Sequence, residues 1–147
     1  MAVRRHRVCV VLDTNVILAA FLSRSPRSAN LKVYRMWVDR QLQLVLSDAI
    51  QAEYLAVLAR LGVSARQRRR FAQRLATRPT VTHVRPPRNL KISRDPFDNA
   101  FLGAAETGGA RFLVTNDADL LEIPVAEMRH FRFRIVTPND FLSRVRR

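Results

Sequence analysis

Acidic side chains follow two apolar stretches of the chain, each at the point where the stretch ends. Asp13 comes directly after the run VCVVL, and Asp117 comes two residues after FLVT. An aspartate at the end of a buried strand either caps the next helix or belongs to a site, and for Asp13 the position alone favours neither. In TNDADLL we expect Asp119 to cap a short helix and Asp117 to face the same crevice as Asp13.

Glu53 lies in a different context, within the helix that DAIQAEYLAVLARLG predicts. Apolar residues recur there at helical spacing and predict a buried stripe of Ile50, Tyr54, Val57, Leu58 and Leu61. Glu53 falls on the border of this stripe, where a glutamate is more often a solvated surface group than part of a site. We therefore treat it as a candidate only in combination with the other acids.

Asp98 is the most specific of the four acids. DPFDNAFLGAAETGG has the composition of a helix start, with Asp95 as the N-cap and a proline at the first helical position. Asp98 lies at helical spacing before three apolar residues and shares their inward face; these are Phe101, Leu102 and Ala105. The helix dipole accounts for an acid in the first turn but not for its inward direction. A site role is therefore favoured over a structural one.

The four acids together predict a metal site. Crowded carboxylates without a counter-charge repel one another and bind protons more tightly, and a divalent cation removes that conflict. An all-oxygen ligand set suits Mg²⁺ or Mn²⁺, whereas Zn²⁺ calls for His or Cys. The three histidines, His6, His83 and His130, are far apart in the sequence and form no metal-binding spacing.

The order of the predicted elements places these acids in an α/β fold. Strands are expected at 7–13, 42–47, 80–84, 111–115 and 132–136. Helices are expected at 15–22, 29–40, 48–61, 64–76, 95–108, around 119–121 and from Pro138 onward, with an extended connection at 86–93. Continuous apolar strands between helices predict a three-layer α/β/α domain with a mostly parallel central sheet, spanning 1–147. Ligands of such sheets bind beyond the carboxyl ends of the strands, where Asp13 is expected.

The charge of the chain favours a polyanionic partner. Its 147 residues carry 26 basic against 12 acidic side chains, a formal net charge of +14. All the basic residues except Lys32 and Lys91 are arginines, which reflects either a GC-rich genome or the ability of guanidinium groups to grip phosphates and stack on bases. No stretch has the length or the hydropathy of a membrane span, and Cys9 is expected to be a small buried hydrophobe. We expect a cytoplasmic protein.

The densest basic run is RQRRRFAQRLATR, at 66–78. Such a helix is more often a solvated face that buries Phe71 and Leu75 than a binding surface. The functional alternative is a phosphate-binding arm beside the acidic pocket, supported by Arg85, Arg88 and Arg94. The residues that would carry it are Arg68, Arg69, Arg70 and Arg74. Phe21, Tyr34 and Trp37 are expected in the core or at a partner surface rather than as platforms for bases.

These motifs, taken as an ordered set, resemble the PIN-domain family. The matching stretches are VVLDTNVILAAF, the Glu53 helix, DPFDNAFLGAAETGGARFLVTNDADLL and RIVTPNDFL, between Val8 and about Leu142. The resemblance is strongest to the branch identified as toxin components of prokaryotic toxin–antitoxin systems, the VapC-type ribonucleases. Phe97 and Asn116 depart from that branch, which often has an acid and a glycine there.

The resemblance implies a Mg²⁺- or Mn²⁺-dependent endoribonuclease. Its catalytic and metal-binding acids would be Asp13, Glu53, Asp98 and Asp117, with Asn15 and Thr115 as supporting polar neighbours. It also implies an RNA substrate and a cognate antitoxin protein, and homodimers are common among relatives.

Two other functions fit part of the pattern. A phosphatase or receiver-like domain also places an Asp after its first strand, but it usually needs a second acid where Asn15 stands and a lysine at a late strand end. A catalytically silent RNA-binding member of the family would retain the basic surface. The presence of all four acids argues against it.

Overall fold

Five strands form one sheet in the computed structural model, which describes residues 7–87 and 96–145 without the side chains of Arg78 and 96–98. The strands are β1 (Val8–Leu12), β2 (Leu42–Leu46), β3 (Val81–His83), β4 (Phe112–Val114) and β5 (Arg134–Val136). All four strand pairs are parallel, in the order β3-β2-β1-β4-β5. The predicted α/β class with a parallel central sheet is therefore confirmed.

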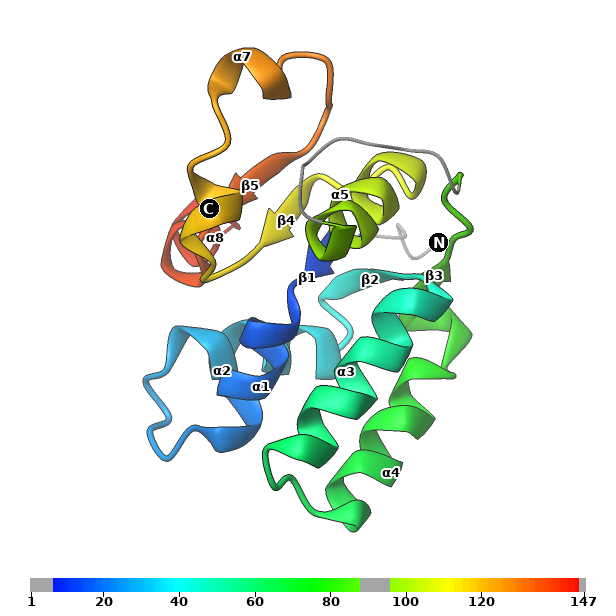
Figure 1. The fold of residues 1–147 in the computed structure, drawn as a ribbon. Helices are drawn as coiled ribbons and strands as arrows, with labels where there is room; N and C mark the ends of the chain where they lie inside the picture. The colour runs from blue at the N-terminus through cyan, green and yellow to red at the C-terminus, as the bar shows by residue number, and fades with distance from the viewer. Residues whose placement is uncertain (1–6, 88–95, 146–147) are drawn as a thin grey trace, which may run out of the picture.

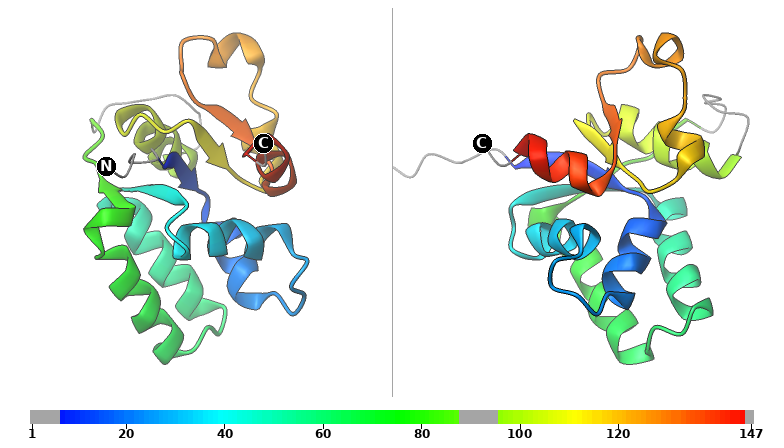
Figure 2. Two further views of the ribbon diagram at one scale, coloured as in Figure 1. Left: turned by 180° about the vertical axis from the view of Figure 1, so that it is seen from behind. Right: turned by 90° about the vertical axis from the view of Figure 1, so that its left-hand side faces the viewer.

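Helices cover both faces of this sheet (Figures 1 and 2). They are α1 (Thr14–Leu22), α2 (Ala29–Val38), α3 (Asp48–Arg60), α4 (Ala65–Leu75), α5 (Pro96–Thr107), α6 (Ala118–Leu121), α7 (Val125–Met128) and α8 (Pro138–Val145), with a 3₁₀ turn at Arg78–Thr80. α5 packs on β1, β2 and β4 from one side, while α2 and α8 pack on β2 and β4 from the other. Val10, Val11 and Leu12 are all fully buried, as expected for a central strand covered on both faces.

The strand order reverses at β1. From β1 the chain moves outward to β2 and β3, then returns to place β4 on the other side of β1 and β5 beyond it. The carboxyl ends of β1 and β4 therefore meet at a topological switch point, where parallel α/β sheets bind ligands. Asp13 follows β1 directly, and Thr115 follows β4 directly.

An aromatic cluster joins the helices of the first half of the chain. The ring of Phe71 in α4 packs on Phe21, Tyr34, Trp37 and Tyr54, with centroids 5.5–6.3 Å apart. The indole Nε1 of Trp37 donates to the Thr80 carbonyl at 3.1 Å. Phe71 and Leu75 are buried as predicted, so one face of the arginine-rich helix belongs to the core. Trp37, predicted in the core or at a partner surface, is buried in the core.

Several local predictions were wrong. Leu61 is 48% exposed because it is the C-cap of α3 rather than part of its buried stripe. Cys9 is only half-buried against the core. α7 was not predicted, because four residues are too few to show a helical period. Asp95 and most of the 86–93 connection lie outside the described residues.

Gly108 provides a test of the packing of α5 against the sheet. A Cβ at this position would lie 2.5 Å from Cγ1 of Val45, a fully buried residue of β2. We expect Gly108→Ala to destabilise the fold by about 1–3 kcal/mol, since overpacking forces a rigid neighbour to shift. Urea unfolding followed by circular dichroism measures the change.

Gly109→Ala serves as the matched control. It introduces strain at a φ of +63° but meets no atom within 4 Å, so about 1 kcal/mol is expected. In the double variant Gly108→Ala, Val45→Ala, the loss should be smaller than the sum of the two single losses. Additive losses would contradict the proposed contact.

Candidate active site at the switch point

Asp13 is the buried centre of the candidate site. Its side chain is 7% exposed, and it is the N-cap of α1, with Oδ1 accepting from the Thr14 amide at 2.7 Å. Oδ2 accepts from the Thr115 hydroxyl at 2.6 Å and from Nδ2 of Asn15 at 3.2 Å. Capping and participation in a site are therefore not alternatives for Asp13, because one oxygen caps the helix and the other faces the groups that follow β4.

Glu53 is brought to this centre from α3. Its Oε2 accepts from the hydroxyl of Thr14, the residue next to Asp13, at 2.6 Å. The neighbouring Tyr54 is fully buried and donates its hydroxyl to the carbonyl of Leu12, the last residue of β1. Two successive residues of α3 thus fasten the second turn of that helix to the β1–α1 junction. Glu53 is half-buried, in agreement with its predicted position on the border of the stripe.

Asp117 approaches Asp13 from the other side. The Thr115 hydroxyl that donates to Asp13 also accepts from the Asp117 amide at 2.9 Å, which holds the β4–α6 turn close to β1. Asp117 is itself the N-cap of α6, with Oδ1 accepting from the Asp119 amide at 3.0 Å. The prediction that Asp119 caps this helix was therefore wrong. Asp117 keeps its second carboxylate oxygen for other contacts.

Asp98 is the third residue of α5, whose body packs on β1, β2 and β4. Its side chain lies outside the described part of the structure. Phe101, Leu102 and Ala105 are all buried, so the stripe that Asp98 was predicted to head does face the sheet.

The electrostatics of the site follow from this crowding. Burial is the largest cause that raises the pKa of Asp13 above its ordinary value; the hydrogen bonds from Thr115 and Thr14 lower it in part, and the negative charges of Glu53 and Asp117 raise it further. The pKa of Tyr54 is raised well above its ordinary value, first by complete burial and then by the charges of Asp13 and Glu53. Glu53 and Asp117 thus lie close enough to Asp13 for their charges to disfavour its ionisation.

These donors suit a hard divalent cation. The described groups around Asp13 present only oxygen and amide atoms, the donor type of Mg²⁺ and Mn²⁺ sites. His83, the last residue of the edge strand β3, pairs instead with Asp48 at 2.9 Å. Among the described residues, which leave out the Asp98 side chain, no group of three or more His, Cys, Asp or Glu side chains is already arranged to hold an ion. The acids fit such an ion by chemistry, with Asp98 needed to complete the set.

Three amides form a part of the site that sequence reasoning only partly identified. Oδ1 of Asn15 accepts from the amide of Asn116 at 3.2 Å, and Nδ2 of Asn116 donates to Oδ1 of Asn30 at 2.8 Å. This chain links the first turn of α2 to the carboxylate of Asp13 through Asn15. The roles of Thr14 and Asn30 were missed; the position of Thr14 between Asp13 and Asn15 was the only available signal.

The basic helix α4 lies beside α3, one helix away from these acids (Figure 1). Arg69, Arg70 and Arg74 are exposed on it. Arg68 is half-buried, and its Nε donates to the Val63 carbonyl at 3.1 Å, so part of its donor capacity is used within the helix terminus.

Residues 9–119 match the family described as PIN domain. The chain belongs to the PIN-domain family. No curated protein sequence matches it.

Among solved structures, this protein is similar to a chain in the crystal structure of VapBC2 from Rickettsia felis bound to a DNA fragment from their promoter. The TM-score is 0.54 at 12% sequence identity, over 88% of this chain and 98% of that chain. At this identity the similarity concerns the fold. No helix among the described residues is long and apolar enough to cross a membrane.

The raised pKa of Asp13 leads to a stability prediction. The native state binds this proton more tightly than the unfolded state, so stability falls as pH rises from the ordinary pKa of aspartate through the raised native pKa, and the loss is complete above it. Asp13→Asn in chelator at pH 7 should therefore raise the melting temperature, because the amide carries no charge to bury. Differential scanning calorimetry measures it.

Glu106→Gln is the matched control, because it removes one negative charge from an exposed position at the far end of α5. It should leave the melting temperature unchanged. An equal rise in both variants would assign the effect to net charge rather than to the site.

Proposed function

We propose that this PIN-domain protein is a Mg²⁺- or Mn²⁺-dependent endoribonuclease that hydrolyses RNA phosphodiester bonds. The observation that carries the proposal is the convergence of Asp13, Glu53 and Asp117 at the switch point, each held by a hydroxyl or a backbone amide. A metal ion bound there lowers the pKa of a water molecule and offsets negative charge on the phosphate. The protein supplies geometry and charge rather than a covalent nucleophile.

The residues of the chain have separate roles in this proposal. Asp13, Glu53, Asp98 and Asp117 are the proposed metal ligands and catalytic acids. Thr115 orients Asp13 and the Asp117 turn together, while Asn15 holds Oδ2 of Asp13 from the helix side. Thr14 orients Glu53. Neighbouring hydroxyl and backbone amide groups thus orient the three described carboxylates.

The substrate class rests on charge. A formal net charge of +14, carried almost wholly by arginines, favours a polyanion, and α4 offers exposed arginines one helix away from Glu53. We propose Arg68, Arg69, Arg70 and Arg74 as part of the RNA path. The cytoplasm is the proposed compartment.

The biological role rests on similarity. Since a chain of the VapBC2 structure shares the fold, we propose that the protein is the toxin of a toxin–antitoxin pair, with a cognate antitoxin as partner and a homodimer as its own assembly. These three points go beyond the fold and depend on the nuclease activity being present.

Cleavage of RNA is the first test. Purified protein should cut total RNA with Mg²⁺ or Mn²⁺ and not with chelator, and Asp13→Asn or Asp98→Asn should lower the rate by a factor of at least about 10³, as expected when a charge essential to the transition state is lost. Denaturing gels with end mapping measure the products, and circular dichroism checks the fold.

The same assay distinguishes the proposed ribonuclease from a catalytically silent RNA-binding protein. That alternative predicts RNA binding without metal-dependent cleavage in the wild type. If the wild type cleaves RNA, undiminished activity in either purified aspartate variant would contradict the assignment of the acids.

The basic helix is tested through salt dependence. Replacing Arg68, Arg69 and Arg70 by Gln removes three positive charges, so the slope of log K against log salt for single-stranded RNA should flatten by about 2 units, at roughly 0.7 per contact. Fluorescence anisotropy at several salt concentrations measures the slope. An unchanged slope would show that α4 does not contact RNA.

A charge-matched variant controls for the loss of net charge. Three exposed arginines lie in β5 or just before it, at the opposite end of the strand order from β3; they are Arg129, Arg132 and Arg134. Their replacement by Gln should leave the RNA slope within about 0.5 units of wild type, because long-range charge is screened at physiological salt.

A further inference from the structure

A hollow lies between the β4–β5 connection and β5. Its volume is about 610 Å³, and it is lined by residues of the 120–136 segment together with Asp140 and Arg144 of α8. We call it the crossover groove. In Figures 1 and 2 the part of the chain around α7 stands out from the body of the molecule beside β5. None of the proposed catalytic residues lines it.

The groove runs along a free sheet edge. β5 has β4 as its one strand neighbour among the described residues. The Arg134 amide donates to the Arg111 carbonyl at 3.0 Å, and the Val136 carbonyl accepts from Thr115 at 2.9 Å, so both residues direct their backbone groups toward β4. In a parallel ladder the residue between them directs its N–H and C=O to the opposite side. Ile135 therefore offers an unpaired donor and acceptor at the edge.

Consecutive residues of β5 line the groove, which shows that the groove follows the edge itself. Side chains alternate between the faces of a sheet, so a pocket on one face would be lined by every second residue. Here Arg134, Ile135 and Val136 all contribute, as does Phe133 before them. An extended segment lying in the groove would therefore be placed to pair with Ile135.

The lining combines an apolar floor with a basic rim. Ile123, Met128 and Ile135 are half-buried aliphatic side chains in the groove, and Val125 on its border is 85% exposed. Arg129, Arg132 and Arg134 are exposed around them, and none of these three forms an ion pair within the described residues. Glu122 and Glu127 belong to the same connection but do not line the groove.

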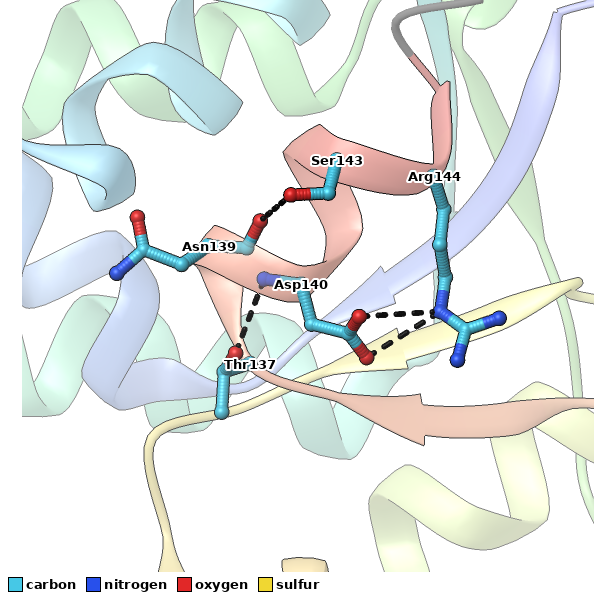
Figure 3. Close-up of polar contacts among 5 residues, drawn as sticks. All are labelled: Thr137, Asn139, Asp140, Ser143 and Arg144. Atoms are coloured by element: carbon cyan, nitrogen blue, oxygen red, sulfur yellow. Dashed lines mark hydrogen bonds and ion pairs between the residues drawn. The ribbon is translucent and has the colours of Figure 1, made fainter.

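Arg144 differs from these three because its charge is already balanced. Its Nε lies 3.2 Å from both carboxylate oxygens of Asp140, one helical turn earlier (Figure 3). The start of the same helix is fixed by Thr137, whose hydroxyl accepts from the Asp140 amide at 3.1 Å. Both residues line the groove, and the unpaired positive charge within the described residues lies at Arg129, Arg132 and Arg134.

We propose that the crossover groove binds an extended acidic and apolar peptide segment of a partner protein, which adds to β5 as a further strand. The free edge supplies backbone pairing, the aliphatic floor takes alternate apolar side chains, and the three arginines take the carboxylates between them. This occupant satisfies all three features of the groove at once.

Two other occupants fit the groove less well. An RNA strand would use the arginines but needs exposed aromatic faces for its bases, whereas Phe133 is 3% exposed and Phe131 packs on it with centroids 5.5 Å apart. A second copy of this chain related by two-fold symmetry would bring the same arginines together, and their charges would repel.

Peptide binding tests the proposal. The probe is a fluorescent peptide of alternating Glu and Ile residues, and its counterpart has Lys in place of Glu. The acidic peptide should bind at least about tenfold more tightly, because only it complements the rim. Replacing Arg129, Arg132 and Arg134 by Gln should weaken it by a similar factor, whereas the charge-matched replacement of Arg68, Arg69 and Arg70 should change its affinity less than about twofold.

The edge is tested separately. Ile135→Pro removes the outward N–H without removing a bond to β4, and it should weaken the acidic peptide at least about fivefold, since strand addition needs that donor. Ile135→Val keeps the N–H and should bind like wild type. Circular dichroism and melting temperature show whether each variant is folded, and hydrogen exchange at Ile135 should slow when the peptide binds to the wild type.

The results that overturn the proposal are distinct. Equal affinity for both peptides, or none for either, excludes an acidic segment. Undiminished binding by folded Ile135→Pro excludes strand addition. If single-stranded RNA displaces the peptide, and the same three arginine substitutions weaken the binding of that RNA, the groove is an RNA site. If those substitutions convert a dimer into a monomer in sedimentation, the groove is a self-interface. None of these results depends on whether the protein cleaves RNA.

Discussion

The hydrogen bond between Thr115 and Asp13 is the contact on which the site depends. It joins residues 102 positions apart at the carboxyl ends of β1 and β4, in the crevice that the reversal of strand order creates. The same hydroxyl accepts from Asp117, so one threonine sets the positions of two acids. On the other side, Thr14 draws Glu53 toward the same point. The acids are thus held by neutral hydroxyl donors rather than by arginines, although the chain is rich in arginine.

This arrangement leaves negative charge uncompensated within the described part of a strongly basic chain. Burial and two neighbouring acids raise the pKa of Asp13, and the hydrogen bonds from Thr115 and Thr14 offset only part of the cost. An arginine beside Asp13 would have balanced the charge permanently. Neutral donors keep the carboxylates oriented but leave the electrostatic cost at Asp13 in place. In the proposed function a bound cation relieves that cost, so the protein without the cation has a lower free energy of unfolding than one with a balanced charge at this position. The basic side chains remain on the surface, where they are available to phosphates or acidic partners.

The sequence predicted the framework of the site better than its details. The apolar runs that precede Asp13 and Asp117 revealed the ends of two strands. Parallel strands bring their carboxyl ends to the same edge of the sheet. The choice between Asp117 and Asp119 as helix cap failed because TNDADLL offers an acceptor at either position, and only the backbone of the turn decides between them. Thr14 was overlooked since its partner, Glu53, is 39 residues away and spacing carries no information on such a contact. The crossover groove could not be foreseen, because it depends on which edge of β5 stays unpaired.

Paramagnetic broadening by Mn²⁺ in the nuclear magnetic resonance spectrum tests the central claim most directly, namely that folding gathers these acids around one ion. Substoichiometric Mn²⁺ should selectively broaden the backbone amide signals of residues 13–15, 53, 98 and 115–117, and excess Mg²⁺ should reverse the effect. Exposed acids elsewhere, such as Asp39 and Glu106, should keep sharp signals and report non-specific binding. Broadening that spares residues 13, 53 and 117, or that spreads evenly over exposed acids, would contradict the account.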